Sequence, residues 1–193
     1  MAPLRLFVAV EVDARVKNQV RAWLPALRGA LPFTRWVPMD NLHVTLHFLD
    51  EQPPARVPEI VAGMHRVARE IPPFSLRLGP LGTFARQGVP TVLWVRVEGD
   101  VAVLRHAHRR LGEVFRDWGY RPDARPYTPH LTLARNGTRP LRSDELAQWA
   151  PGTPMVWRVN ALALYRSELH PTGARYTVLA RVPLRGERQG AEV

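Results

Sequence analysis

The sequence predicts an α+β or mixed α/β fold in a single domain, and three observations support this. Helical patterns alternate with short strands rich in Val, Leu and Phe, and tight turns join several strand pairs. No Pro-, Gly- or Ser-rich linker divides the 193 residues, a length that suits one domain or two small lobes with a shared core. Helices flank each of two strands that carry the same short pattern, which indicates two similar halves.

The strands are predicted from period-two alternation and from β-branched and aromatic content. They are expected at residues 4–12, 35–38, 41–49, 74–78, 91–97, 126–135, 155–165 and 175–184. Segment 79–90 is expected to be a loop, because glycine and proline occur at both of its ends around Phe84 and Arg86. Pro171-Thr172-Gly173 is expected to form the turn between the last two strands.

The helices are predicted from capping residues and flanking prolines. They are expected at residues 14–31, 55–70, 99–118 and 143–149. Asp13 can cap the first helix, in which Pro25 is expected to introduce a kink or an end. The Pro53-Pro54 pair opens the second. The domain is expected to cover residues 1–185, because residues 186–193 lack apolar periodicity and are expected to be a disordered tail.

Charge and composition limit the classes of function. The formal net charge of +10 favours a polyanionic partner such as nucleic acid, although Lys17 is the only lysine and an arginine-rich skew can also reflect genome composition. The absence of cysteine excludes disulfides and thiolate metal sites. The apolar segment 4–10 is interrupted by Arg5 and too short for a signal sequence, and no run reaches membrane-spanning length. A soluble cytoplasmic protein is therefore expected.

Two segments carry the pattern His-x-Thr-Leu: Leu42-His43-Val44-Thr45-Leu46 and Pro129-His130-Leu131-Thr132-Leu133. Alternate side chains of a strand point to opposite faces, so His43 and Thr45 share a face, as do His130 and Thr132. Each copy thus presents one imidazole beside one hydroxyl on a rigid element. A single copy would more often hold an ordinary strand histidine, but two matching copies indicate a functional pair.

This pairing meets the needs of cyclic phosphate cleavage. Water attacks phosphorus on one side while an ester oxygen leaves on the other, so one group must accept a proton and another must donate one. Histidine can do both near neutral pH, and each such transfer typically contributes about 10²–10⁴-fold in rate. The threonine hydroxyls can donate hydrogen bonds to the non-bridging phosphate oxygens. Two strands from two lobes can place the imidazoles on opposite sides of phosphorus.

The residues around both motifs resemble the 2H phosphoesterase superfamily, and within it the RNA 2′,3′-cyclic phosphodiesterases, also called 2′-5′ RNA ligases. The paired motifs are the specific part of the resemblance, which covers nearly the whole chain. Its supporting segments are residues 5–9, 36–43, 82–84, 92–94, 127–135, 167–169 and 173–176. Asp40 departs from the pattern, because family members often have Glu there.

The resemblance implies a bilobal α+β fold, in which two antiparallel sheets face a central cleft, helices lie outside and the halves are related by a pseudo-two-fold axis. It implies metal-independent hydrolysis of an RNA 2′,3′-cyclic phosphate end to a 2′-phosphomonoester, with no cofactor. His43 would donate a proton to the 3′ oxygen and His130 would accept one from water, although spacing alone does not assign these roles. Thr45 and Thr132 would hold the phosphate. We expect a monomer without an obligate protein partner or membrane attachment.

Two further residues are candidates for substrate binding. Arg135 matches a family arginine that contacts phosphate, but in an ideal strand it lies on the face of Leu131 and reaches the cleft only if the strand ends or bulges. Phe84 can stack on an unpaired base or anchor its loop in the core. Arg86 beside it can meet a backbone phosphate or remain a solvated surface charge.

The remaining histidines and the basic helix are expected to have structural roles. His47 is expected on the face of His43, at the cleft edge or one layer behind the substrate. The apolar residues of that strand are expected in the core: Leu42, Val44, Leu46 and Phe48. Solvated helix faces are favoured for His65, His106 and His108. The same holds for Arg105, Arg109, Arg110 and Arg116, with RNA binding as the alternative. No metal-ligand motif is present.

Two other classes of function remain open from the sequence. One is a related enzyme that acts on a small cyclic nucleotide, an ADP-ribose cyclic phosphate or a 2′-5′ oligonucleotide, or that carries out reversible 2′-5′ ligation. The other is a module that binds RNA ends without turnover. The second would show salt-dependent binding and leave the cyclic phosphate intact.

Overall fold

The computed structural model describes residues 2–171 and 173–187. The strands are β1 (Leu4–Glu11), β2 (Phe33–Trp36), β3 (His43–Gln52), β4 (Phe74–Arg86), β5 (Val89–Gly99), β6 (His130–Gly137), β7 (Val156–Val159), β8 (Ala161–His170) and β9 (Gly173–Pro183). The helices are α1 (Ala14–Ala30), α2 (Val57–Ala68), α3 (Val101–Arg116) and α4 (Ser143–Ala147), with 3-10 turns η1 (Met39–Asn41) and η2 (Pro54–Arg56).

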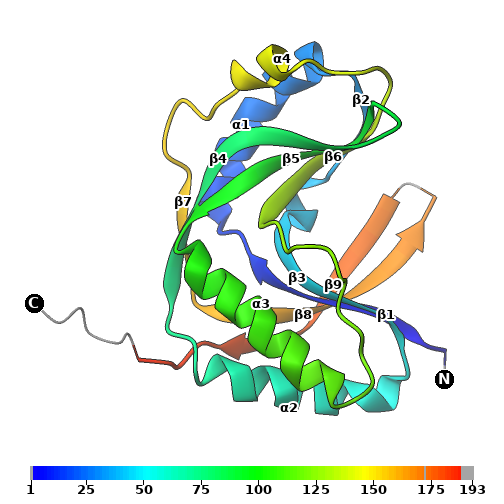
Figure 1. Cartoon of the computed structure of the whole chain (residues 1–193), viewed down its shortest axis with the longest axis vertical. Helices are drawn as coiled ribbons and strands as arrows, with labels where there is room; N and C mark the ends of the chain where they lie inside the picture. The colour runs from blue at the N-terminus through cyan, green and yellow to red at the C-terminus, as the bar shows by residue number, and fades with distance from the viewer. Residues whose placement is uncertain (1, 172, 188–193) are drawn as a thin grey trace, which may run out of the picture.

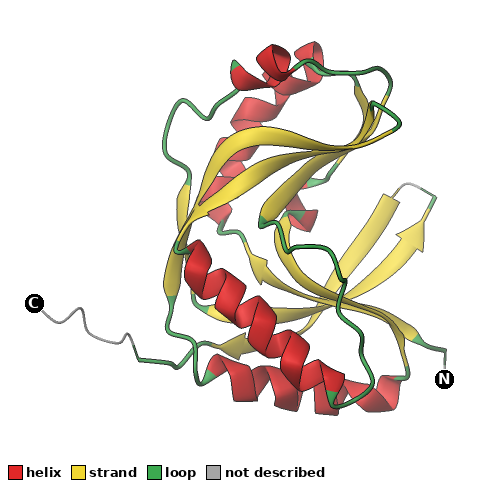
Figure 2. Cartoon of the chain, viewed as in Figure 1, coloured by secondary structure: helices red, strands yellow, loops and turns green. Residues whose placement is uncertain are grey.

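The strands form two antiparallel sheets. The four-stranded sheet has the order β3-β1-β8-β9 and the five-stranded sheet the order β2-β6-β5-β4-β7. The two sheets diverge from the region where β3 approaches β6 (Figure 1), and the helices lie on the outside (Figure 2). The expected α+β class with two antiparallel sheets is therefore confirmed. Below, the faces that the two sheets turn toward each other are called the inner faces.

The helices are exchanged between the two sheets. α1 follows β1 of the four-stranded sheet but lies behind the five-stranded sheet, where Arg15 donates to the Val156 carbonyl and Arg28 lies over the Trp36 ring. Conversely, α3 follows β5 of the five-stranded sheet and packs against β3, beside α2, which packs against β8 and β9. Each sheet therefore buries its outer face under helices, one of which the other half supplies, and a single main core connects both halves.

The expected loop at 79–90 is wrong. β4 and β5 form one long hairpin that pairs without an intervening loop, apart from the two-residue turn Gln87-Gly88. Gly79 and Gly82 occur in this strand because neighbouring side chains lie where a Cβ would be: the Glu98 carboxyl over Gly79 and the Trp94 indole over Gly82. Glycine here signals close packing within a sheet, not a loop.

Two other expectations change. The strand expected at 155–165 is divided at Asn160 into β7 and β8, which belong to different sheets, because apolar alternation continues through the crossover and hides it. α1 continues through Pro25 to Ala30, so this proline does not end the helix.

The expected disordered tail, residues 186–193, is described only in its first two residues. At the start of the expected tail, Gly186 donates its N–H to the Ile71 carbonyl at 3.0 Å. Residues 188–193 of that tail lie outside the described residues. Within the described part of the chain, no helix is both long and apolar enough to cross a membrane.

The β4–β5 turn yields a test of stability. Gln87 and Gly88 both have positive φ, 51° and 79°, as in the type I′ turn that prefers Asn-Gly. We expect Gln87→Asn to raise the free energy of unfolding by up to about 1 kcal/mol, because Asn tolerates this backbone conformation better. Gln87→Val should lower it, because a β-branched residue tolerates it worst. Urea unfolding of both variants measures this; a Val variant as stable as the Asn variant would contradict the turn.

Candidate functional site

The two strands that carry the His-x-Thr-Leu pattern approach each other where the sheets meet. β3 is the edge strand of the four-stranded sheet, and β6 is the second strand of the five-stranded sheet. Each pairs antiparallel with the strand that precedes it in its own half, β1 or β5 (Figure 1). The sequence-predicted histidines therefore lie at the base of the space between the inner faces.

Both histidines are oriented in the same way. The Nδ1 of His43 lies 2.7 Å from the carbonyl oxygen of Asn41, and the Nδ1 of His130 lies 2.7 Å from that of Thr128. A carbonyl oxygen only accepts, so each Nδ1 carries the hydrogen and each neutral ring keeps a lone pair on Nε2. Asn41 is itself held, since its side-chain amide donates to the Ala174 carbonyl at 2.7 Å.

The surroundings favour the neutral form of both imidazoles. Burial lowers the pKa of His43 to about 4. The Asn41 carbonyl raises this pKa, while repulsion from His130, when that ring is protonated, and from Arg135 lowers it. Burial also lowers the pKa of His130. The Thr128 carbonyl raises this pKa, and the charge of Arg135 lowers it. Without a bound anion, therefore, both rings are neutral at neutral pH and keep a lone pair on Nε2.

The motif threonines lie on the same face as their histidines, as expected. Thr45 Oγ1 is 3.0 Å from His43 Nε2, so the hydroxyl can donate to the ring's lone pair. Thr132 pairs with Trp94 of β5, on the inner face of the five-stranded sheet. Both threonines are half-buried and therefore accessible from between the sheets.

A β-bulge follows the threonine in each motif. The extra residue is Leu46 in β3 and Leu133 in β6, which is the same position of the pattern in both copies. A bulge places two residues of one strand opposite one residue of its partner, so every later side chain changes face relative to ideal alternation. The internal repeat thus extends to an irregularity of the backbone that the motif letters do not reveal.

The bulge at Leu46 overturns the expectations for His47 and Phe48. His47 turns away from His43 and is only 3% exposed: its Nε2–H donates to the His108 carbonyl at 2.7 Å, on the α3 side of β3. Phe48, expected in the core, is 55% exposed, and its ring centroid lies 5.8 Å from that of Phe7 on the inner face.

The bulge at Leu133 brings Arg135 to the inner face. Arg135 pairs with Val92, two residues from the Trp94 that pairs with Thr132, so all four side chains share that face. The charge of Arg135 lowers the pKa of both motif histidines, as expected for a guanidinium near both rings. The condition under which this arginine could reach the cleft is therefore met.

Aromatic side chains surround His130. Phe84 lies edge-on to the imidazole with ring centroids 5.1 Å apart, and Trp94 lies 6.0 Å away. Phe84 belongs to β4 and is 39% exposed, so it contacts the His130 ring while leaving part of its own ring accessible. It was predicted as a loop residue, and its expected contact with a base stays a prediction.

A second group of rings surrounds His43. Phe7 lies 4.8 Å from the imidazole and Tyr176 lies 5.3 Å away, while Tyr165 stacks on Phe7 at 4.9 Å. These residues form a small apolar cluster, separate from the main core, on the inner face of the four-stranded sheet. The cluster keeps water from one side of His43, which explains why burial lowers its pKa so far.

Three stacked rings brace one motif strand against the approach to the other. His108 lies between His47, at 4.2 Å, and Tyr127, at 4.0 Å. The Tyr127 hydroxyl, three residues before His130, donates to the Thr45 carbonyl at 2.9 Å. This hydrogen bond joins the first motif to the segment that leads into the second, so it helps to fix their spacing.

Sequence reasoning missed this brace. His108 was expected on a solvated helix face, and its position two residues after His106 does not indicate a ring stack. The available signal was the place of Tyr127 next to the second motif, where a large polar aromatic side chain requires a buried partner for its hydroxyl.

The basic helix is engaged by carboxylates. Arg109 and Arg110 pair with Glu113, and Arg110 also pairs with Glu70. Arg105 donates to the Tyr127 carbonyl at 2.7 Å. These guanidinium groups therefore have partners within the protein, which favours the structural interpretation over RNA binding for this helix.

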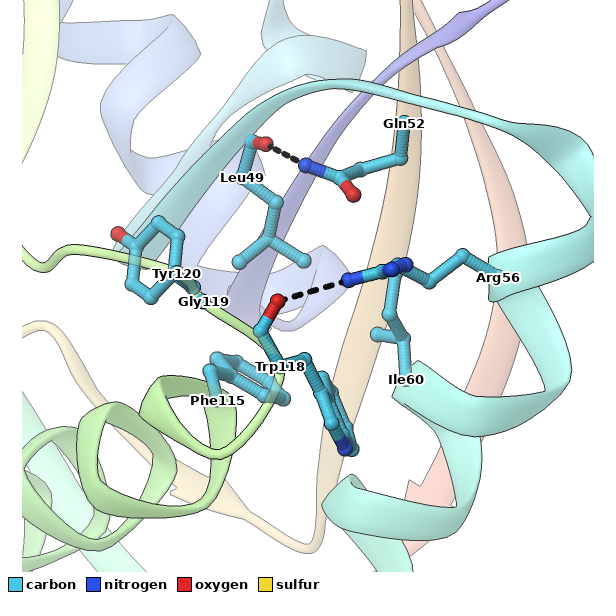
Figure 3. Close-up of a pocket in the computed structure, with 8 residues that line it drawn as sticks. All are labelled: Leu49, Gln52, Arg56, Ile60, Phe115, Trp118, Gly119 and Tyr120. Atoms are coloured by element: carbon cyan, nitrogen blue, oxygen red, sulfur yellow. Dashed lines mark hydrogen bonds between the residues drawn. The ribbon is translucent and has the colours of Figure 1, made fainter.

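A pocket lies apart from the motif histidines. This pocket, between β3, α2 and the end of α3, is lined by Leu49, Gln52, Arg56, Ile60, Phe115, Trp118, Gly119 and Tyr120 (Figure 3). Its polar groups are engaged locally, since Arg56 donates to the Trp118 carbonyl at 3.0 Å. Among residues 2–171 and 173–187, no group of three or more His, Asp or Glu side chains is arranged to hold a metal ion.

Sequence comparisons identify close relatives. A family model described as the 2′-5′ RNA ligase superfamily matches residues 12–171. An RNA 2′,3′-cyclic phosphodiesterase of Thermus thermophilus is 36% identical over 195 residues, which cover 95% of this chain and 92% of that protein. One of Geobacillus stearothermophilus is 32% identical over 186 residues; the match covers 95% of this chain but only 58% of that protein's length.

Structural comparisons agree with these matches. The crystal structure of TT0787 of Thermus thermophilus is similar with a TM-score of 0.75 and 34% identity, over 95% of this chain and 100% of that one. The crystal structure of E. coli LigT complexed with 3′-AMP has a TM-score of 0.78 and 27% identity, over 94% and 98%. The similarity therefore extends over both sheets and includes both motif strands.

The ring stack predicts a selective loss of stability. Tyr127→Phe removes the hydroxyl that joins β3 to the segment before β6, and we expect the free energy of unfolding to fall by about 1 kcal/mol. Tyr120→Phe is the matched control, because its hydroxyl reaches His47 Nδ1 at a longer 3.3 Å and joins no second motif. Urea unfolding measures both; equal effects of the two variants would contradict the brace.

The burial of His43 predicts its titration. In the protein without substrate, the pKa of His43 should lie near 4, well below about 6.5 for an unperturbed imidazole. Because the unfolded chain then binds the proton more tightly, the stability due to neutral His43 is fully present above pH 6.5 and is lost as the pH falls toward 4. NMR titration of the His43 Cε1–H signal tests this, and a midpoint at 6.5 or above would contradict it.

Proposed function

Because the chain belongs to the 2′-5′ RNA ligase superfamily, we propose that it hydrolyses RNA ends that carry a 2′,3′-cyclic phosphate and leaves a 2′-phosphomonoester. The relatives named RNA 2′,3′-cyclic phosphodiesterase, matched over nearly the whole chain, support this substrate. The observation that carries the proposal is the matched pair of Nδ1–carbonyl hydrogen bonds, which leaves Nε2 of both His43 and His130 available for proton transfer.

The proposed reaction is a single in-line displacement at phosphorus. The water oxygen forms a bond to phosphorus while His130 Nε2 accepts the proton that water loses. The P–O3′ bond breaks on the opposite side, and His43 Nε2 gives its proton to the departing O3′, while the P–O2′ bond remains. Each imidazole thus serves one of the two proton transfers, and we propose that the reaction requires no metal ion.

The acid must acquire its proton before it can donate it. The empty site keeps His43 neutral, because burial lowers its pKa to about 4 and the positive charge of Arg135 also opposes its protonation. A cyclic phosphate carries a negative charge, which would raise this pKa when bound beside the ring. Binding of the substrate therefore favours the protonated form of His43, which can then act as the acid.

Four other side chains are proposed to hold the substrate. Thr45 and Thr132 would donate to the non-bridging phosphate oxygens. The Thr45 hydroxyl is free to do so once His43 is protonated, because Nε2 then no longer accepts its hydrogen bond. Arg135 would pair with the phosphate charge through its planar guanidinium. Phe84, against the His130 ring, would contact the terminal nucleotide from that side.

The wider properties of the protein stay predictions. We propose that residues 1–185 act as one domain and that the protein works as a monomer in the cytoplasm, without a cofactor, a membrane or an obligate protein partner. Its macromolecular partner would be the RNA substrate itself, for which the formal net charge of +10 is favourable.

Removal of either imidazole tests the mechanism. We expect His43→Ala and His130→Ala each to lower kcat by about 10²–10⁴-fold, because each removes one proton transfer. His65→Ala, which removes an exposed histidine of α2, is the matched control and should retain wild-type activity. The assay follows RNA ending in a 2′,3′-cyclic phosphate in the presence of EDTA, with phosphorus NMR to identify the product.

Three results would contradict the proposal. Full activity in both histidine variants would exclude them as acid and base. A 3′-phosphomonoester product would show that the other ester bond breaks. Loss of wild-type activity in EDTA would show that a metal ion takes part. Faster turnover of a small cyclic nucleotide or an ADP-ribose cyclic phosphate would favour the alternative substrates.

A further inference from the structure

The two halves of the repeat differ at one position of the inner face. Phe48 and Arg135 are each the third residue after the motif threonine, and the matching bulges at Leu46 and Leu133 turn both toward the space between the sheets. One half therefore presents a cation, and the other presents an aromatic ring that is 55% exposed. A phosphate explains the cation but not the ring.

Phe48 extends the aromatic surface beside His43. The ring of Phe7 lies between them, with its centroid 4.8 Å from that of His43 and 5.8 Å from that of Phe48. Phe7 is buried and Tyr165 stacks on it, so packing holds the Phe7 ring in place beneath Phe48 and His43. Phe48 thus offers an accessible aromatic ring one side chain beyond the acid.

The geometry of the reaction says which part of an RNA would pass this ring, and this step rests on the proposed function. In-line displacement sends O3′ toward the acid, His43. In ribose, C3′ is bonded to C4′, which carries the C5′ arm that leads to the preceding nucleotide. The rest of the RNA therefore continues on the His43 side, where Phe48 lies beyond Phe7, and not on the side of the attacking water and His130.

We propose that Phe48 is a stacking platform for the base of the nucleotide that precedes the cyclic phosphate nucleotide. Unpaired bases stack on accessible aromatic rings, largely independently of base identity. The site would then select single-stranded RNA ends over cyclic mononucleotides, which lack this base. Phe84, directly against His130, differs because it would contact the terminal nucleotide, which both kinds of substrate contain.

A comparison of two substrates tests the platform. The measured quantity is the ratio of kcat/KM for a dinucleotide ending in a 2′,3′-cyclic phosphate to kcat/KM for the 2′,3′-cyclic mononucleotide. Phe48→Ala should lower this ratio by about 10-fold, the size of one stacked base. Phe48→Trp should preserve it, because the larger ring also stacks. Leu179→Ala, which truncates an apolar side chain of β9 that is 37% exposed, is the control and should leave the ratio at the wild-type value.

An abasic substrate separates stacking from other effects. When the dinucleotide lacks its first base, the wild-type enzyme should already show the lower ratio, and Phe48→Ala should lower it no further. An unchanged ratio in Phe48→Ala would overturn the platform. An equal loss of the ratio with the complete and the abasic dinucleotide would also overturn it. Neither result would contradict the proposed hydrolysis. Failure of the wild-type protein to hydrolyse either substrate would instead overturn the proposed function, and the platform with it.

Discussion

Each motif histidine donates Nδ1–H to the carbonyl oxygen two residues earlier, and the rest of the site depends on this contact. His43 and His130 are the first residues of β3 and β6, so Asn41 and Thr128 precede the strands and their carbonyls lie outside the sheet ladders. This hydrogen bond fixes the tautomer and aims Nε2 away from the backbone. The direction of Nε2 decides whether the threonine hydroxyl, the neighbouring rings and the residues after the bulge can act on the same substrate group.

The two halves share a backbone plan but differ chemically. Both have a motif strand paired with the preceding strand of the same half, a bulge at the motif leucine and a helix that covers the opposite sheet. The difference lies in what surrounds each imidazole: a closed aromatic cluster at His43, and Phe84 with Arg135 at His130. Burial and the charge of Arg135 lower the pKa of both imidazoles, so their proposed roles differ through the side of the phosphate on which each ring lies.

The motif strands, the shared face of each His-Thr pair and the α+β class follow from sequence, because alternation and repetition are local signals. The bulges do not, since a bulge is a mismatch between two strands that one strand cannot reveal, and so the faces of His47 and Phe48 were predicted wrongly. Gly79 and Gly82 predicted a loop because close packing by Glu98 and Trp94 depends on residues distant in the chain. The stack of His47, His108 and Tyr127 likewise exists only after folding.

The most direct test of the two-histidine mechanism is a crystal structure with a nucleoside 2′,3′-vanadate, whose five-coordinate vanadium mimics the proposed transition state. We expect His43 Nε2 and His130 Nε2 to lie beside opposite apical oxygens, each within about 2.6–3.2 Å. The ribose 3′ oxygen should be the one that faces His43. Both imidazoles on the same side of vanadium, or either one beyond reach of an apical oxygen, would contradict the two-histidine mechanism.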